Sequence, residues 1–247
     1  VEVEVVQGNE TRCLRAALLV GADGNASAVR VACGIETDGY DYGQHALIAQ
    51  VKVEHPQPYT AFEHFTREGP LAMIPCGGAC YVSVQCLHEA RALAASKLDD
   101  IAYGVELERR FGARLGRITV CGPRRAHALV RQRARRLTDP RLVLLGNAAN
   151  TMHPNAAQGL NLGLRDVATL AASLAAGGDA GAADGLARYA LARAPDQRNT
   201  VGFSDLLAQS FRSRLCTVTA TRRLALALAD LCPAAKQRFI HEASGLA

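Results

Sequence analysis

Two stretches of the chain share one pattern, an apolar run that ends in a glycine and is followed by small polar residues. The first run covers residues 14–20 and ends in Gly21, and the second covers residues 142–145 and ends in Gly146. An uninterrupted apolar run is typical of a strand covered on both faces, and the glycine with its polar neighbours ends the strand in a turn. The two runs therefore predict two strands of an open α/β sheet.

Each predicted strand is followed by a helical pattern. Ser27 can cap a short helix over residues 27–33, which Gly34 ends. After the second strand, apolar residues fall on one helix face, so we expect a helix that begins near Gln158 and buries this face. The residues of this face are Leu160, Leu164, Val167, Ala171 and Leu174.

A different pattern separates the two α/β segments. Between residues 40 and 86, short apolar or alternating runs are divided by turn residues, which predicts an antiparallel sheet. The four runs are residues 44–54, 59–66, 70–76 and 79–86. Farther along, residues 97–111 predict a helix and residues 118–129 a returning strand.

The two ends have simpler patterns. Residues 1–8 alternate like a half-buried strand before a turn at Gly8–Asn9, and after residues 177–178 the chain reads as helices interrupted at Pro195 and Pro233. We therefore expect an α/β layer interrupted by an α+β domain. The predicted parts are an α/β layer at residues 1–34 and 137–178, an antiparallel-sheet domain at 35–136 and C-terminal helices at 179–247.

Composition narrows the class of protein. The chain has 247 residues, 49% of them apolar, which is enough for one large domain or two smaller ones with cores. No run approaches the about 18 apolar residues of a membrane span, and the first residues do not resemble a signal peptide, so we expect a cytoplasmic protein. The eight cysteines show no CxxC and no paired histidines at zinc spacing, so we expect reduced thiols and no metal site.

The net charge of +5 is a mild excess, much of it in residues 124–141. This basic run fits a solvated face, which is the commoner case, or an anionic membrane surface or nucleotide phosphate. Residues 213–242 mix leucine with arginine and lysine, which fits packing on the protein's own domain or an amphipathic face for a partner or membrane. We expect no nucleic-acid partner.

The loop after the second predicted strand has the composition of a ligand site. A helix start has N–H groups without an intrahelical acceptor and a partial positive charge, so it attracts an electron-rich ligand atom. Gly159 and Gly163 would allow close approach to the backbone, and the loop supplies uncharged asparagine and glutamine side chains between small alanines. This suits a large neutral heterocycle better than a phosphate, although a plain strand–helix connection has similar composition.

Taken together, the two glycine turns resemble a known family. GADGNASAVR at residues 21–30 and LLGNAANTMHPNAAQGLNLGLRD at 144–166 are similar to two fingerprints of the class A flavin-dependent aromatic hydroxylases, approximately ADGxxSxxR and GDAAHxxxPxxGQGxNxGxxD. Residues 61–86 resemble the substrate-domain core of the ubiquinone-biosynthesis branch. The resemblance covers nearly the whole chain and implies that the α/β layer is a Rossmann-like FAD-binding domain and residues 35–136 a substrate domain.

The resemblance assigns roles around FAD. Asp23 and Gly24 would lie near the flavin pyrophosphate and the path of NAD(P)H, with Arg30 in support. The second fingerprint would hold the ribityl chain and the isoalloxazine ring, with the helix-start amides facing the N1 and C2 carbonyl edge and stabilising negative charge there. The residues implied in this part are Gly146, Asn147, Pro154, Gln158, Gly159, Leu160 and Asn161.

The chain also departs from the family pattern. Asn147 replaces the usual aspartate, Asn150 the usual histidine, and Ala157 the first glycine of GQG, which adds a Cβ where the loop passes the ring. A GxGxxG that follows a strand and opens a helix is missing from the sequence. We therefore expect the chain to be the C-terminal part of a longer protein, inactive alone and holding half of a flavin site.

For the longer protein, the resemblance implies that NAD(P)H reduces FAD and that chemistry at the flavin C4a position uses O2 to hydroxylate a polyprenylated phenol. Partners would include other ubiquinone-biosynthesis proteins and the inner face of a membrane, to which the protein would bind peripherally. Two alternatives remain: a non-catalytic module of this fold that binds a lipid or partner, and a related flavin hydroxylase with another aromatic substrate.

Candidate residues for the substrate site are less specific. Five apolar or glycine positions in the antiparallel domain are expected as pocket walls, namely Phe65, Gly69, Pro70, Leu71 and Met73. His153 and His64 are the histidines considered for the catalytic site. Neither has a carboxylate partner in its motif, so a structural role is the commoner case for each.

Overall fold

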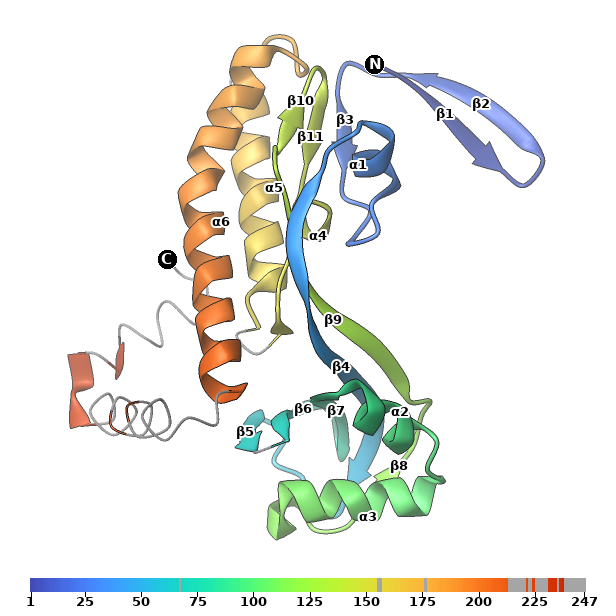
Figure 1. Cartoon of the computed structure of the whole chain (residues 1–247), viewed down its shortest axis with the longest axis vertical. Helices are drawn as coiled ribbons and strands as arrows, with labels where there is room; N and C mark the ends of the chain where they lie inside the picture. The colour runs from blue at the N-terminus through green and yellow to red at the C-terminus, as the bar shows by residue number, and fades with distance from the viewer. Residues whose placement is uncertain are drawn as a thin grey trace. The chain divides into compact units, whose positions relative to one another are not determined.

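The computed structural model describes residues 1–66, 68–154, 157–175 and 177–212, and a few residues between 221 and 237. Within these residues the chain forms two compact units, the first made of Val1–Tyr40 and Arg131–Ala208 and the second of Asp41–Val130. The chain passes between the units in strands β4 (Thr37–Val53) and β9 (Arg125–Ala134) (Figure 1). The segment at residues 213–242 lies almost entirely outside the described part.

The first unit contains a three-stranded sheet in the order β10-β11-β3. β3 (Leu19–Gly21) and β11 (Leu142–Leu144) are parallel, with Val20 opposite Val143, and β10 (Thr138–Asp139) is antiparallel to β11. Strands from both predicted runs therefore share one sheet, which confirms the α/β prediction. Of the first run, residues 14–20, only Leu19 and Val20 lie in β3, because residues 14 and 15 belong to a separate hairpin. β11 is fully buried, whereas Val20 of β3 is 40% exposed, so coverage on both faces holds for β11 and not for β3.

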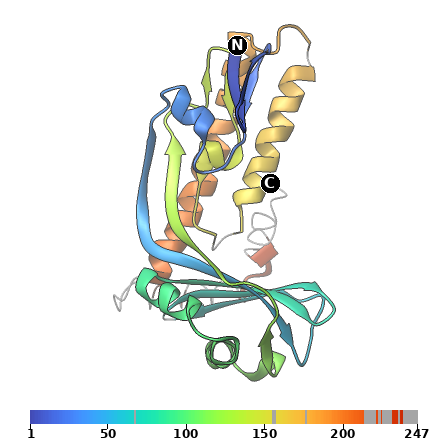
Figure 2. The same ribbon diagram turned by 90° about the vertical axis from the view of Figure 1, so that its right-hand side faces the viewer.

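Helices cover this sheet because side chains alternate along β11. Leu142 and Leu144 contribute to one core with Ile35 and the short helix α4 (Gly146–Ala149). Val143 belongs to a second core with residues of α5 (Gly159–Ala175) and α6 (Ala183–Arg212), which lie side by side (Figure 2). The short helix α1 (Ala28–Ala32) has the predicted cap, since the Ser27 hydroxyl accepts a hydrogen bond from the Arg30 amide at 3.0 Å.

Two local predictions for this unit were wrong. Pro195 does not interrupt the helix, because α6 continues through it. Proline removes one backbone hydrogen-bond donor from the helix. Arg193 and Gln197, on either side of Pro195, are buried and hydrogen-bonded to Asp166, and these tertiary contacts keep the helix continuous. The N-terminal residues do form a hairpin, β1 (Glu2–Gln7) and β2 (Glu10–Arg15) around Gly8–Asn9, but its side chains are almost all exposed rather than half-buried.

The second unit is built on an antiparallel sheet in the order β9-β4-β7-β6-β5, with β8 (Ile118–Val120) also paired to β4. In the first unit, β12 (Asn150–Thr151) pairs with the end of β9 and completes the sheet. The four predicted strands are present as β4, β5 (Phe62–Thr66), β6 (Gly69–Gly77) and β7 (Cys80–His88). The predicted single strand at residues 118–129 is two strands, β8 and β9, joined by a turn. The presence of a large antiparallel sheet in one unit and an α/β layer in the other confirms the predicted fold class.

Helices cover one face of this sheet and bury its core. The helices are α2 (Glu89–Ser96), which the sequence analysis missed, α3 (Asp100–Phe111) and a 3-10 turn, η1 (Ala113–Leu115). Tyr103, Leu107 and Phe111 of α3 pack against sheet residues that include Leu71 and Met73 of β6. Both of these side chains are 0% exposed.

Candidate functional site

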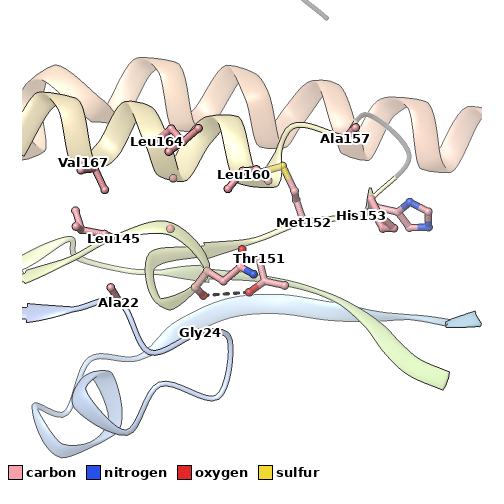
Figure 3. Close-up of a pocket in the computed structure, with 15 residues that line it drawn as sticks. Ala22, Gly24, Leu145, Thr151, Met152, His153, Ala157, Leu160, Leu164 and Val167 are labelled. Atoms are coloured by element: carbon pink, nitrogen blue, oxygen red, sulfur yellow. Dashed lines mark hydrogen bonds between the residues drawn. The ribbon is translucent and has the colours of Figure 1, made fainter. Parts of the chain in front are cut away.

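A pocket of about 640 Å³ lies in the first unit, where both glycine turns meet the first half of α5 (Figure 3). Ala22 and Gly24 line it from the first turn, and Leu145 to Asn147 from the second. The remaining wall consists of the loop from Thr151 to Pro154, Ala157 and the start of α5. The sequence thus brings together two segments more than a hundred residues apart, because β3 and β11 are parallel neighbours whose carboxyl ends open at the same edge.

In the first turn, the backbone faces the pocket and the charged side chains do not. Gly24 has φ +86° and lines the pocket. The Asp23 carboxylate instead accepts a hydrogen bond from the Val29 amide at 3.1 Å, at the start of α1. Burial alone would raise the pKa of Asp23, but hydrogen bonds from Ser27 and from backbone amides outweigh it and lower the pKa below its usual value.

Arg30 connects the two turns. Its side chain is buried, with 4% exposure, and donates hydrogen bonds to the carbonyl oxygens of Ala148 at 2.8 Å and Asn25 at 2.7 Å. A guanidinium group is suited to this task because its donors lie in one plane at fixed angles. Arg30 therefore joins the backbones of the two turns and is not among the residues that line the pocket.

The second turn approaches helix α5 closely. Gly146 has φ +53°, a conformation that favours glycine, and a Cβ built on Gly163 would lie 3.4 Å from the Gly146 Cα. Next to it, Asn147 is exposed and lines the pocket, and its carbonyl oxygen accepts a hydrogen bond from the Thr151 hydroxyl at 3.1 Å (Figure 3). The Asn147 amide is thus accessible to a ligand hydroxyl.

The start of α5 forms the opposite wall. The helix begins at Gly159, as predicted, and Gly159 and Leu160 line the pocket with Pro154. Gln158 is 4% exposed, and its carbonyl accepts the first helical bond, from the Leu162 amide at 2.8 Å. Asn161 is half-buried and is not part of the wall.

The prediction that the leucine-rich face of α5 is buried was wrong. Leu160 is 74% exposed, Leu164 58% and Val167 51%, and all three line the pocket (Figure 3). The buried face of the helix carries Leu162, Asp166 and Leu170, spaced four residues apart. Hydrophobicity alone selects the wrong face, because a buried aspartate interrupts the face that packs inward.

Asp166 is the site-related residue that sequence reasoning missed. It is 0% exposed, and its carboxylate accepts hydrogen bonds from the Gly146 amide at 3.0 Å, from Arg193 Nε at 2.7 Å and from Gln197 Nε2 at 2.9 Å. The available signal was its position as the last residue of the second fingerprint, on a helix that is otherwise apolar.

The predicted catalytic and substrate residues lie in different places. His153 lines the pocket and is 2% exposed, whereas His64 is exposed on β5 of the second unit. Phe65 and Pro70 pair across β5 and β6, next to the Gly69 position. Phe65 is exposed and Gly69 half-buried, so they stay candidates for a substrate wall, whereas Pro70 is buried. The side chains of Leu71 and Met73 fill the helix-covered core of that unit, so they have a packing role and no surface for a ligand in this structure.

In the part of the chain that the structure describes, no three histidine, cysteine or acidic side chains gather at a point where they could hold a metal ion. Over the same residues, no helix combines the length and the hydropathy needed to cross a bilayer.

A family model and several curated proteins match most of the chain. The family described as FAD binding domain matches residues 1–204. The chain is 38% identical over 241 residues to the ubiquinone hydroxylase UbiL of Rhodospirillum rubrum, covering 96% of this chain and 56% of that protein. It is 31% identical over 237 residues to the 3-demethoxyubiquinol 3-hydroxylase of Escherichia coli, covering 94% and 60%. The chain thus spans little more than half the length of these relatives.

Solved structures show the same fold. The Diels-Alderase PyrE3 of pyrroindomycin biosynthesis superposes with a TM-score of 0.78 at 24% identity, over 99% of this chain and 53% of that one. The anhydrotetracycline hydroxylase OxyS of Streptomyces rimosus superposes with a TM-score of 0.73 at 22% identity, over 99% and 49%. Identities this low establish the architecture alone.

The residues present fit a flavin. The volume is typical of a small-molecule pocket, and the wall is largely apolar with a few uncharged polar groups. Glycine at 146 and 163 leaves the narrow gap between the turn and α5 open, where larger side chains would close it. The chain belongs to the FAD-binding domain family, whose cofactor is FAD.

Proposed function

We propose that the chain is the flavin-seat and substrate part of an FAD-dependent monooxygenase that hydroxylates a polyprenylated phenol in ubiquinone biosynthesis, with NAD(P)H as reductant and O2 as oxidant. The observation that carries the proposal is the pocket formed where two glycine turns meet the start of α5. The relatives named as ubiquinone hydroxylases support the substrate class. The resemblance of the motifs favours 2-octaprenyl-6-methoxyphenol as the specific substrate.

The bound flavin would supply the redox and oxygen chemistry, and the protein would position it. The Gly24 backbone would lie near the pyrophosphate, the Asn147 amide would bind a ribityl hydroxyl, and Pro154 would contact the ring. The helix-start amides at Gly159 and Leu160 would donate to the carbonyl edge of the ring and favour negative charge there, because these groups have no acceptor within the helix.

The substrate would be held by the second unit. Phe65 is exposed at the end of β5 and Gly69 begins β6 beside it, and the exposed ring would suit contact with an aromatic ring or a polyprenyl tail; Pro70, which is buried, would support this position from below. His153 in the pocket wall and His64 on β5 remain the candidates for proton transfer. Binding of other ubiquinone-biosynthesis proteins, and of an anionic membrane surface by residues 124–141, belongs to the same proposal.

The direct test is to titrate the chain with FAD. FAD fluorescence and the absorbance spectrum of the bound flavin report the binding. Gly163→Leu should abolish binding, because its side chain would fill the gap between α5 and the Gly146 turn. Gly202→Leu is the matched control, since Gly202 is also a helical glycine and has no atom within 4 Å of an added Cβ. Equal affinity in both variants would contradict the assignment of the pocket.

If FAD binds, oxidation of NAD(P)H should be measured with and without a prenylated phenol, and the product analysed for one added oxygen atom. Flavin binding without substrate-dependent oxidation by the longer protein would favour the alternative of a non-catalytic module that binds a lipid or a partner. Turnover of a different phenol would favour a related hydroxylase with another substrate.

A further inference from the structure

One face of helix α6 makes hydrogen bonds to residues that form or support the wall of the pocket, at three positions. Tyr189, Arg193, Gln197 and Ser204 are spaced by four, four and seven residues, which puts them on one side of the helix. All four are buried, with exposures of 0%, 5%, 2% and 0%. A buried polar face on a long helix requires partners on the neighbouring element.

Two of those partners lie at the ends of one stretch, residues 144–153, which contributes several residues to the wall of the pocket. The Tyr189 hydroxyl donates to the Leu144 carbonyl at 3.2 Å, where the strand ends. The Ser204 hydroxyl donates to the His153 carbonyl at 2.8 Å, where the loop leaves the pocket. Burial and the nearby charge of Asp166 raise the pKa of Tyr189, so its hydroxyl stays protonated and remains a donor.

The third and central contact passes through Asp166. One carboxylate oxygen accepts from the Gly146 amide, and the other accepts from Arg193 and Gln197 of α6. Burial alone would lower the pKa of Arg193, but hydrogen bonds to Asp166 and Asp196 raise it above its usual value, so the guanidinium stays charged. Hydrogen bonds to a charged acceptor are the stronger kind, and they are directional.

We infer that Asp166 is a positioning residue for the flavin, and that it acts by holding the Gly146 turn at a fixed distance from α5. The turn needs such support because Gly146 has a positive φ and glycine has many accessible conformations. A single buried acceptor that is itself fixed by two donors from α6 removes this freedom before a ligand arrives, which lowers the cost of binding. This inference rests on the proposed flavin site.

Asp166→Asn tests the inference with little change in shape. An amide presents one oxygen and one NH2 group, so a donor must face either the Gly146 amide or the two donors of α6. The matched control is Asp196→Asn. Asp196 belongs to the same ion-pair network and is partly exposed, and its polar partners in the described part of the chain are Arg165, Arg193 and Thr200, none of them within residues 144–153.

Two readouts are needed, amide hydrogen exchange without flavin and the Kd for FAD. In Asp166→Asn we expect amide exchange at residues 144–153 to become about tenfold faster or more, and the Kd for FAD to rise by a similar factor. This is the size expected for the loss of one charge-assisted hydrogen bond. Asp196→Asn should change both by less than about threefold, as for a partly exposed ion pair. Exchange that is unchanged in Asp166→Asn, or equally fast in both variants, would overturn the inference.

The exchange readout also separates this inference from the proposed function. If the unmodified chain bound no FAD, the flavin assignment would fail, and the exchange comparison would still decide whether Asp166 holds the turn. If Asp166→Asn did not fold, Tyr189→Phe and Ser204→Ala remove one hydroxyl each at the other two contacts. Faster exchange confined to the corresponding end of residues 144–153 is then expected, and a uniform or absent change would overturn the inference.

Discussion

Ala157 has a backbone conformation that suits glycine, and replacing it should stabilise the protein. Its φ is +51°, and it stands where the family pattern has glycine. An L residue in the left-handed region costs about 1–2 kcal/mol, because its Cβ approaches the following carbonyl. Ala157→Gly removes this cost.

The net gain is smaller than the strain. Glycine increases the conformational entropy of the unfolded chain, which costs about 0.4–1 kcal/mol relative to alanine. The methyl group is exposed at the pocket, so little burial is lost, and the backbone hydrogen bond from the Ala157 amide to the Pro154 carbonyl at 2.9 Å does not depend on the side chain. The free energy of unfolding should therefore rise by about 1 kcal/mol, or about 2–4 °C in Tm for a chain of this size.

Urea unfolding and thermal denaturation measure this change, and two controls make its sign informative. Ala168→Gly, at an exposed position inside α5, should destabilise by about 0.5–1 kcal/mol. Arg141→Gly should also destabilise, although Arg141 has φ +55°, because its guanidinium binds the Ala17 carbonyl and Asp179. If Ala157→Gly lowered stability as much as Ala168→Gly, the reasoning from backbone strain would be refuted.

Three further changes test other parts of the structure. Asn161→Asp should weaken FAD binding in a titration, because it adds negative charge beside the helix start, and an unchanged Kd would argue against the proposed seat. Asn150→Leu should raise the free energy of unfolding, measured by urea denaturation, by about 1 kcal/mol, because both polar atoms of this 2% exposed side chain lack a partner within the described residues. Lower stability of the variant would contradict this. Hydrogen bonds from Arg109 and Arg91 lower the pKa of Glu106 to about 2 from 4.5. The stability lost in Glu106→Gln should therefore be largest above pH 4.5 and vanish as the pH falls towards 2, and a pH-independent difference would show that charge is not the cause.

Local patterns predicted the elements that depend on local physics. The Ser27 cap, the start of α5 at Gly159 and the strands that end in Gly21 and near Gly146 all follow from neighbouring residues. The alternation along β6 correctly separates two faces. It does not say which face meets the helices, so Leu71 and Met73 were expected at a pocket and are in the core instead.

Long-range partners decided what the sequence could not predict. Asp166 is tolerated inside because Arg193, 27 residues away, supplies its counter-charge, and nothing near Asp166 in the sequence indicates this pair. The continuation of α6 through Pro195 has the same origin, since Arg193 and Gln197 on either side of it are held by Asp166. A proline is read as a helix break when only propensity is considered.

The reversed polarity of α5 links these observations to binding. A helix of a globular protein normally turns its apolar face inward, yet α5 buries Asp166 and leaves Leu160 and Leu164 exposed. The inner face packs through Leu162 and Leu170, and Asp166 between them is satisfied by charge and hydrogen bonds, so the exposed leucines are not needed for packing within the unit. Exposed apolar area is unfavourable in water, by about 25 cal/mol per Å², and a flat ligand that covers it recovers this energy. The same helix can therefore hold the Gly146 turn with Asp166 on its inner side and offer the exposed leucines of its outer side to a flavin.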